Sequence, residues 1–503
     1  MSAATMTHLV SDAADRYGER IALTLPGEGE YSYHQLDELT GRFAGGLSAL
    51  GVGPGDRVVL YLPNGWQWIV AYHAIARLGA AVVPANILLS AQEVAYIAAD
   101  SQAVATILPA ERCDSVLLDG QVRRITLGPA ADTQTDTYAF ETLLEGDYRG
   151  PVERVPEDLF TIGYTSGTTG KPKGAMLTHR ALYESLAGTA TMHVRHAGDV
   201  VLSSLPFAHV YGNIVMNAMF LSGARLVATP KFDASLTFEL IAKERVTLFE
   251  GVPTMYYQML AHPKIAAADL SSLQRCTVGG QTMPIAKIKA VVDRFGCPLL
   301  ELWGMTEVAG PAVTHSPYWA PRPGSIGQPF PGTSARIADL NDVSKDAPCG
   351  TPGELLVRGP QVTVGYYNNP TATEQALDGD GWFATGDVAY MDADGFLYIV
   401  DRKKDMIITA GYNIYPAELE QVVAMHPDVV MTAVAGLPDD EKGEIAVAFV
   451  VRHEGSLLDE AMLLAHCRQY LAAYKVPRSV RFVPDLPKTS TGKLMRRLLA
   501  DLA

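Results

Sequence analysis

The segment from Tyr164 to Gly174, Y-T-S-G-T-T-G-K-P-K-G, has the composition of a loop that binds a polyphosphate. Glycines let backbone N–H groups close around an anion, hydroxyls add neutral donors, and lysines supply positive charge. The spacing is not that of a Walker A loop, because Pro172 follows the first lysine where that loop has serine or threonine. We therefore predict phosphate binding by a different loop. Its candidate ligands are Thr165, Ser166, Gly167, Thr168, Thr169, Gly170, Lys171 and Lys173.

Four further motifs follow this loop along the chain. They are E-L-W-G-M-T-E-V-A-G at 301–310, G-W-F-A-T-G-D at 381–387, D-R-K-K-D at 401–405 and P-K-T-S-T-G-K at 487–493. With these motifs in this order, the chain from about Tyr31 onward resembles the adenylate-forming superfamily of acyl-CoA synthetases, luciferases and stand-alone adenylation domains. The resemblance implies an enzyme that uses ATP and Mg²⁺ to join a carboxylic acid to AMP, and that then transfers the acyl group to coenzyme A.

The resemblance also implies which residues hold the nucleotide. Adenylation brings several anions together, so the site must neutralise a carboxylate, an α-phosphate and the departing pyrophosphate. The loop at 165–173 would hold the β- and γ-phosphates, and Thr306 would contact the α-phosphate. Glu307 and Thr165 would bind Mg²⁺, a hard cation that prefers oxygen ligands. The remaining implied nucleotide contacts are Gly279, Gly280, Gln281, Trp303 (where the family usually has tyrosine), Asp387 and Arg402.

The resemblance further implies that the end of the chain moves between two half-reactions. Lys493 would bridge the carboxylate oxygen and the α-phosphate, because a compact ammonium can neutralise both anions as they meet. Lys404 matches a hinge about which a small domain rotates after adenylation, and Gly411 would then line a tunnel for the pantetheine arm of CoA. His209, in L-P-F-A-H-V-Y-G, matches an aromatic gate between the acyl pocket and the route of the thiol. The implied catalytic residues are therefore Lys493, His209, Thr306 and Glu307.

The residues that the resemblance places around the acyl group are apolar or small, which favours a hydrophobic monocarboxylate. Malonyl-CoA synthetases of the family have an arginine where this chain has Leu302, so malonate is disfavoured. Ile408 stands where coumarate ligases and luciferases have a lysine. Bacterial fatty-acid–CoA ligases share this variant, and so do some feruloyl ligases. The predicted acyl-pocket residues are Val210, Tyr211, Gly212, Val308, Ala309 and Gly310.

We therefore expect a medium- or long-chain fatty acid as the substrate, with an aryl acid of the cinnamate or ferulate type as the alternative. Free CoA is the expected acceptor. A stand-alone adenylation enzyme that loads a carrier protein is a further alternative, and it would exchange pyrophosphate into ATP while forming little thioester with CoA.

Strands that alternate with helices must position these residues. Short β-branched runs alternate with helical patterns through the first 300 residues, which predicts an α/β fold with parallel-rich sheets and flanking helices. Ser32-x-x-Gln35 indicates a capping box that opens a helix ending near Leu50. The other predicted elements are strands at Arg57–Leu62, Ala80–Pro84, Ala103–Leu108, Val200–Leu205, Arg225–Ala228, Val246–Phe249 and Leu299–Leu302, and a helix at Trp66–Leu78.

The pattern changes near Leu397, where a compact α+β unit begins. We predict a large N-terminal domain over 1–400 that binds AMP and the acyl group, a hinge at 401–404, and a small mobile C-terminal domain over 405–503 that carries Lys493. In the small domain, Pro416 suits the first turn of a helix. Strands are predicted at Val429–Ala435 and Ile445–Val451, and a helix at Asp459–Ala472.

Composition limits the classes of protein to which the chain can belong. With 503 residues, it is too long for one core, and 48% hydrophobic residues indicate a folded globular protein. The net charge of −15 argues against broad binding to nucleic acid or anionic membranes. Five scattered cysteines and the lack of a secretory signal or a long apolar run predict a cytoplasmic protein without a membrane segment. The sequence leaves open whether the protein is a monomer or a homodimer.

Overall fold

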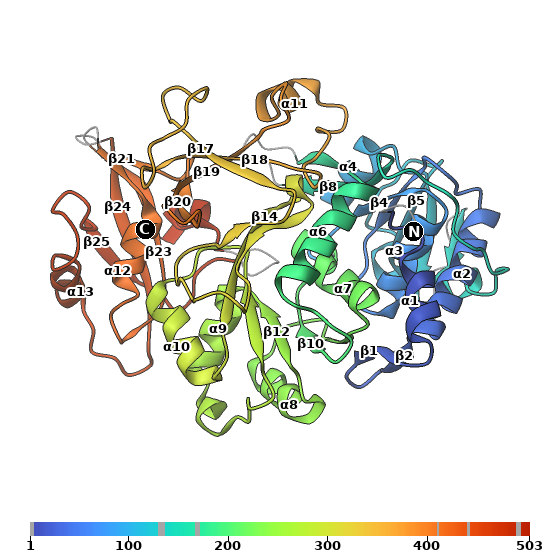
Figure 1. Ribbon diagram of the computed structural model, residues 1–503, viewed down its shortest axis with the longest axis horizontal. Coiled ribbons are helices and arrows are strands. Elements are labelled where there is room, and N and C mark those ends of the chain that lie inside the picture. The colour runs from blue at the N-terminus through green and yellow to red at the C-terminus, as the bar shows by residue number, and fades with distance from the viewer. Residues whose placement is uncertain are drawn as a thin grey trace.

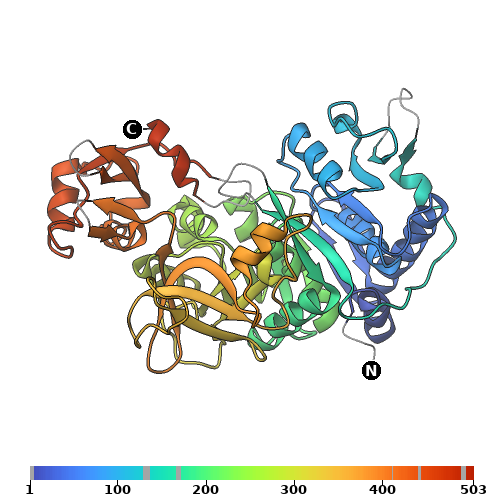
Figure 2. The same ribbon diagram turned by 90° about the horizontal axis from the view of Figure 1, so that it is seen from above.

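The chain forms a large α/β part and a small C-terminal α+β part, as its pattern of strands and helices predicts (Figure 1). The computed structural model describes residues 5–128, 136–165, 172–409, 412–439, 443–488 and 494–502. Figure 2 shows the small part (red) at one end of the molecule and the N-terminal strands and helices (blue) at the other. Among the described residues, no helix has both the length and the apolar character needed to cross a membrane.

Two largely parallel sheets form most of the large part. One has the strand order β7-β6-β5-β3-β4-β8-β9, and the other β16-β15-β14-β13-β12-β10-β11-β1-β2. The first consists of β3 (Arg57–Leu60), β4 (Ala81–Pro84), β5 (Ala105–Pro109), β6 (Arg123–Leu127), β7 (Thr137–Ala139), β8 (Leu159–Thr165) and β9 (Lys173–Thr178). The second consists of β1 (Ile21–Leu25), β2 (Gly29–Ser32), β10 (Val200–Ser203), β11 (Arg225–Ala228), β12 (Leu248–Gly251), β13 (Arg275–Val278), β14 (Leu299–Met305), β15 (Gly310–Thr314) and β16 (Gln328–Pro329).

Helices cover these two sheets and connect their strands (Figure 1). The helix α3 follows β3 and leads into β4, where the sequence predicts a strand–helix–strand unit. The α-helices of the large part are α1 (Leu9–Tyr17), α2 (Tyr33–Ala49), α3 (Trp66–Arg77), α4 (Ala91–Asp100), α5 (Phe140–Leu143), α6 (His179–Met192), α7 (Val210–Ser222), α8 (Ala234–Glu244), α9 (Pro253–Ala261), α10 (Ile285–Phe295) and α11 (Pro370–Ala376). Short 3₁₀ turns lie at η1 (Ala110–Arg112), η2 (Pro263–Ala267) and η3 (Thr306–Val308).

Two smaller sheets follow in the chain. An antiparallel sheet has the order β17-β18-β19-β20, and the sheet of the small part has the order β22-β21-β24-β23, with β25 paired to β24. Their strands are β17 (Ser334–Ala338), β18 (Gly353–Arg358), β19 (Phe383–Met391), β20 (Leu397–Arg402), β21 (Ile407–Thr409), β22 (Tyr412–Ile414), β23 (Val429–Asp439), β24 (Gly443–Arg452) and β25 (Ser479–Phe482). The helices of the small part are α12 (Pro416–Val423), α13 (Glu460–Cys467), η4 (Arg496–Leu498) and η5 (Ala500–Leu502).

Local sequence signals determine where several elements begin. Ser32 accepts a hydrogen bond from Gln35 N, and the Gln35 side chain accepts one from Ser32 N, so the predicted capping box opens α2. Pro416 occupies the first turn of α12, where its missing N–H removes no helical hydrogen bond.

Most predicted elements differ from the observed ones by one to four residues at their ends, and the hydrogen bonds explain two of the differences. The strand predicted to end at Leu302 continues to Met305, because Leu302–Met305 pair with the antiparallel strand β15. The predicted helix at 459–472 ends at Cys467, and the chain continues in turns in which Gln469 N and Tyr470 N donate to the carbonyls three residues earlier.

The small part packs on the large part through an apolar face. Side chains from β23 and β24, among them Met431 and Phe449, belong to the same buried cluster as residues of α9, α10 and β13. Two polar contacts flank this face. Lys287 Nζ donates to the carbonyl of Val429 at 2.6 Å, and Ile285 N donates to Gln421 Oε1 at 2.9 Å.

Candidate active site

The predicted phosphate loop connects two antiparallel strands. Thr165 ends β8 and Lys173 begins β9, and the two residues pair across the strands. The Lys173 ammonium lies 5.5 Å from the ring centroid of Tyr366, which places it beside a residue that also contacts Glu307. The predicted ligands from Ser166 to Lys171 lie outside the described residues.

Glu307 is the buried carboxylate of the site. The strand β14 ends at Met305, and the 3₁₀ turn that follows carries Thr306 and Glu307. Tyr366 Oη donates to Glu307 Oε1 at 3.0 Å. Burial raises the pKa of the Glu307 carboxyl, while Tyr366, the Arg402 charge and the Thr165 hydroxyl act in the opposite direction. The structure therefore brings together Glu307 and Thr165, the two residues predicted to bind Mg²⁺.

The donor set around Glu307 fits a magnesium ion that is shared with a substrate. Among the residues that the structure describes, no group of three or more histidine, cysteine or acidic side chains could hold a metal by itself. Mg²⁺ is commonly held by one or two carboxylates together with substrate phosphates and waters. A cation at this position would also favour the ionised form of a carboxyl that burial otherwise disfavours.

Three of the predicted nucleotide contacts meet, two of them on the paired strands β19 and β20 and the third on β14 of another sheet. Trp303 Nε1 donates to Asp387 Oδ2 at 2.8 Å, and Arg402 Nε lies 3.2 Å from Asp387 Oδ1. Asp387 and Arg402 are partners in the pairing of β19 with β20, so strand register brings them together. The hydrogen bond from Trp303 is a contact that sequence reasoning missed. It holds the Asp387 carboxylate in place, with the indole packed in a buried cluster.

The predicted glycine pair lies at the carboxyl end of a parallel strand. Gly279 and Gly280 follow β13 directly, and Gln281 follows them. A Cβ atom at Gly279 would lie 2.3 Å from Leu302 Cδ1, so only glycine fits against this leucine. Gly280 has a φ of 89°, which glycine adopts without strain.

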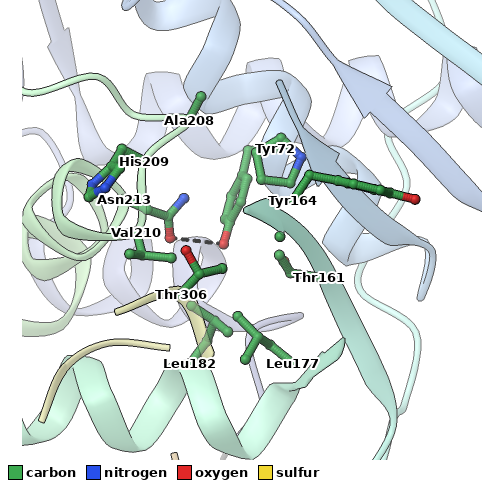
Figure 3. A pocket seen from close by; sticks show the side chains of 12 residues that line it. Tyr72, Thr161, Tyr164, Leu177, Leu182, Ala208, His209, Val210, Asn213 and Thr306 are labelled. Atoms are coloured by element: carbon green, nitrogen blue, oxygen red, sulfur yellow. Dashed lines mark hydrogen bonds between the residues drawn. The ribbon is translucent and has the colours of Figure 1, made fainter. Parts of the chain in front are cut away.

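A cavity of about 60 Å³ lies beside Thr306, the residue that precedes Glu307 (Figure 3). Thr306, His209 and Val210, all predicted for the site, line it. His209 caps α7, where its Nδ1 accepts a hydrogen bond from Tyr211 N at 3.3 Å. The other lining residues are Tyr72, Pro84, Thr161, Gly163, Tyr164, Leu177, Leu182, Ala208 and Asn213.

Two polar residues of the cavity wall were not predicted from the sequence. Figure 3 shows Tyr72 and Asn213 joined by a hydrogen bond, in which Tyr72 Oη donates to Asn213 Oδ1 at 3.1 Å. Asn213 Oδ1 also accepts from Asn217 Nδ2 at 2.9 Å. Tyr72 lies in an apolar helix, and sequence alone offers no signal that separates it from a core tyrosine.

The other predicted acyl-pocket residues are not among those that line this cavity. Tyr211 Oη lies 2.6 Å from Thr277 Oγ1 in a buried polar network. A Cβ atom at Gly212 would lie 2.2 Å from the carbonyl oxygen of Pro206. Val308 and Ala309 are fully buried, and Gly310 adopts a φ of 111°.

The structure describes the predicted hinge residue but not the predicted catalytic lysine. Lys404 is exposed directly after β20, where β20 ends at Arg402. Gly411 and Lys493 lie outside the described residues. Their assigned roles therefore remain predictions.

Glu301, the first residue of the E-L-W-G-M-T-E motif, is a second buried carboxyl near the site. Burial raises its pKa to about 8, and a hydrogen bond from Gly324 N at 2.8 Å opposes this shift. Glu301 is therefore largely protonated at neutral pH, unlike an exposed glutamate.

Comparison with known proteins shows the family to which the chain belongs. The family model for AMP-binding enzymes matches residues 10–367, and the model for their C-terminal domain matches residues 418–493. The chain is 37% identical to the long-chain-fatty-acid–CoA ligase of Yersinia pestis, over 99% of this chain and 94% of that protein. It is 38% identical to a feruloyl-CoA synthase of Amycolatopsis, over 92% of each.

A solved structure has the same fold. The crystal structure of ATP-bound MatB from Rhodopseudomonas palustris superposes with a TM-score of 0.89 at 30% identity, and the match covers 99% of both chains. The motifs, the fold and the matched residues agree, and the chain therefore belongs to the family of AMP-binding enzymes.

Proposed function

We propose that this AMP-binding enzyme is an acid–CoA ligase. It forms acyl-AMP and pyrophosphate from ATP and a carboxylic acid, and then acyl-CoA and AMP from the acyl-AMP and CoA. The observation that supports this proposal is a continuous set of contacts that begins at the cavity wall. Thr306 lines the cavity and precedes Glu307, the Arg402 charge acts on the Glu307 carboxyl, and Arg402 contacts Asp387, which is held by Trp303. Such an arrangement offers an anion site, a nucleotide wall and an adjoining space for an acid.

Each residue has a defined task in the first half-reaction. Asp387, held by the Trp303 indole, accepts hydrogen bonds from the ribose hydroxyls. Thr306, on the cavity wall, donates to the α-phosphate. Mg²⁺ bound at Glu307 would neutralise charge on the phosphates as pyrophosphate departs. Lys493 would neutralise the acid and the α-phosphate as they meet.

The proposed acid is a medium- or long-chain fatty acid. The apolar Leu302, packed against Gly279, supports a hydrophobic monocarboxylate, since a second carboxylate would find no cation at that position. The long-chain-fatty-acid–CoA ligase of Yersinia pestis, which matches over nearly the full chain, supports the same class.

An aryl acid is the second candidate, and the cavity wall favours it. The hydroxyl of Tyr72 and the amide of Asn213 present hydrogen-bonding groups where a long alkyl chain would need apolar contacts. Tyr72 Oη donates to Asn213 and keeps acceptor capacity, so a phenolic hydroxyl could donate to it. The feruloyl-CoA synthase of Amycolatopsis is a relative with this class of substrate in its name.

An assay of AMP release with CoA across fatty, cinnamic, 4-hydroxycinnamic, benzoic and malonic acids tests the function and the choice of acid together. Fatty acids should give the highest kcat/KM, and malonate should be poor. A higher kcat/KM for 4-hydroxycinnamate, lost in Tyr72→Phe, would establish the aryl alternative. ATP–pyrophosphate exchange without thioester formation would instead indicate a carrier protein as the acceptor.

A further inference from the structure

One guanidinium in the small part contacts several carboxylates at once. Arg496 Nη2 lies 2.8 Å from Glu420 Oε2 and 3.0 Å from Glu420 Oε1. Arg496 Nη1 lies 3.4 Å from Asp401 Oδ1 and 3.6 Å from Asp405 Oδ2. The Asp401 side chain is 2% exposed and that of Glu420 11%, so water and salt weaken these two contacts of Arg496 less than they would weaken a surface ion pair.

The carboxylates come from both sides of the proposed hinge. Asp401 lies near the end of β20, before Lys404, whereas Asp405 follows Lys404 and Glu420 lies on α12. Asp401 also accepts from Ala417 N at 2.9 Å, which ties the end of β20 to the start of the same helix. Arg496 therefore contacts the segments that a rotation at 401–404 would move relative to each other.

Arg496 also lies three residues after Lys493 in the chain. The described residues on either side of 489–493 contact each other, because Lys488 and Leu494 form an antiparallel bridge and Met495 N donates to the carbonyl of Pro487 at 2.8 Å. Through Arg496, these flanking residues are tied to Asp401 of β20 and to Glu420 of α12.

We propose that Arg496 is a positioning residue for adenylation, which holds the residues just after Lys493 in one orientation relative to the hinge. This inference rests on the proposed function, because it assigns Lys493 to the adenylation step. An arginine suits the task, since its planar fork can bind several carboxylates in fixed directions, whereas a lysine would contact them as a point charge. A misplacement of about 1 Å at a reacting group can cost on the order of 100-fold in rate.

The test measures each half-reaction in single-turnover experiments on purified Arg496→Gln. Pyrophosphate release from ATP and acid should slow on the order of 100-fold. Thioester formation from pre-made acyl-AMP and CoA should stay close to the wild-type rate. Arg496→Lys should restore part of the adenylation rate, because it keeps the charge and loses the fork.

Arg225→Gln is the matched control. It breaks a similar partly buried cluster, in which Arg225 contacts Glu244 at 2.8 Å and Glu30 at 3.6 Å, on β11 of the large part. The ratio of the two half-reaction rates should not change in this variant. Melting temperatures of all variants show whether a loss of rate follows a loss of stability.

Two outcomes would overturn the inference. One is an equal fall of both half-reactions in Arg496→Gln, which would mean a purely structural role, and the other is an unchanged adenylation rate. A wild-type protein that forms no acyl-AMP from any acid in the panel would refute the proposed function instead, so the two failures are distinguishable.

Discussion

At the scale of single residues, the site depends on side chains whose surroundings change their ordinary chemistry. Glu307 is a carboxyl that burial holds toward its neutral form, and it lies next to the Tyr366 hydroxyl. Trp303 serves as a hydrogen-bond donor to Asp387 and as a core residue at once. Such buried polar contacts orient the reactive groups before a substrate arrives, which limits reorganisation during the reaction.

The first residue-scale prediction concerns Lys493. We expect Lys493→Ala to slow adenylation by roughly two to three orders of magnitude, because one preorganised charge at developing anions contributes roughly 3–4 kcal/mol. Thioester formation from pre-made acyl-AMP should stay near the wild-type rate, since the lysine is proposed to have moved away by then. Single-turnover kinetics of each half-reaction measure both rates.

Lys488→Ala is the control for this substitution. It removes a nearby lysine that pairs with Asp485, and it should leave both rates nearly unchanged. If thioester formation in Lys493→Ala fell as far as adenylation, the proposed domain rotation would be wrong for this protein.

The second residue-scale prediction concerns Glu301. Its pKa of about 8 lies above the ordinary value of 4.5, so the folded protein holds a proton that the unfolded chain releases. The stability that this proton contributes is complete below about pH 4.5 and is lost as the pH rises to about 8. Over that window the free energy of unfolding should fall by up to about 1.4 kcal/mol per pH unit.

Glu301→Gln removes this titration and keeps an acceptor for Gly324 N. The melting temperature of the variant minus that of the wild type should therefore increase from pH 5 to pH 8 and then level off. Thermal denaturation at a series of pH values measures this difference. A difference that is constant with pH would show that Glu301 does not titrate in this range.

At the scale of elements, the pairing of strands determines which site residues meet. The pairing of β19 with β20 brings Asp387 to Arg402, and the pairing of β14 with β15 extends the strand that presents Trp303. Lys404 follows β20 and its side chain is exposed. A change of backbone angles at Lys404 would therefore expose no core side chain at that position.

The element-scale prediction is a substitution at this position. We expect Lys404→Pro to leave acyl-AMP formation largely intact and to slow thioester formation strongly, because proline restricts φ and so the rotation. Lys404→Ala, which leaves φ free, should retain both half-reactions. Stopped-flow measurements of each step distinguish the variants. If Lys404→Pro lost both steps while Lys404→Ala kept them, the hinge would lie elsewhere or the proline would have damaged the fold.

At the scale of the whole molecule, residues far apart in sequence meet at the proposed nucleotide site. Thr165 and Arg402 come from two different sheets and Glu307 from the turn η3 between β14 and β15. The Thr165 hydroxyl and the Arg402 charge both act against burial to lower the pKa of the Glu307 carboxyl, so the three side chains lie close together. The small part packs on α9 and α10 through an apolar face. A nucleotide that contacts several of these segments at once should stabilise the native state as a whole.

The whole-molecule prediction is a thermal shift. ATP with Mg²⁺ at about 100 Kd should add about 2.7 kcal/mol to the free energy of unfolding. Asp387→Ala should lose most of this shift relative to its own ligand-free melting temperature, because the ribose hydroxyls lose their acceptor. Differential scanning fluorimetry with and without EDTA measures the contribution of the metal. An undiminished shift in the variant would remove Asp387 from the nucleotide site.

Much of the fold follows from local signals in the sequence. Alternating β-branched and helical runs predicted the α/β sheets, the S-x-x-Q box predicted the start of α2, and Pro416 predicted the start of α12. The family motifs carry comparable information, because phosphate and nucleotide binding need particular residue types at short spacings. These features depend on neighbours within a few residues, so a single sequence is enough to reveal them.

Only the tertiary structure decided which partners these residues have. The bond from Trp303 to Asp387, the Tyr72–Asn213 pair on the cavity wall and the carboxylates around Arg496 each join segments that are many residues apart. Sequence spacing carries no information on such contacts, because they depend on sheet order and register. Burial is decided in the same way, and it separates Glu301, with a pKa of about 8, from an ordinary surface glutamate.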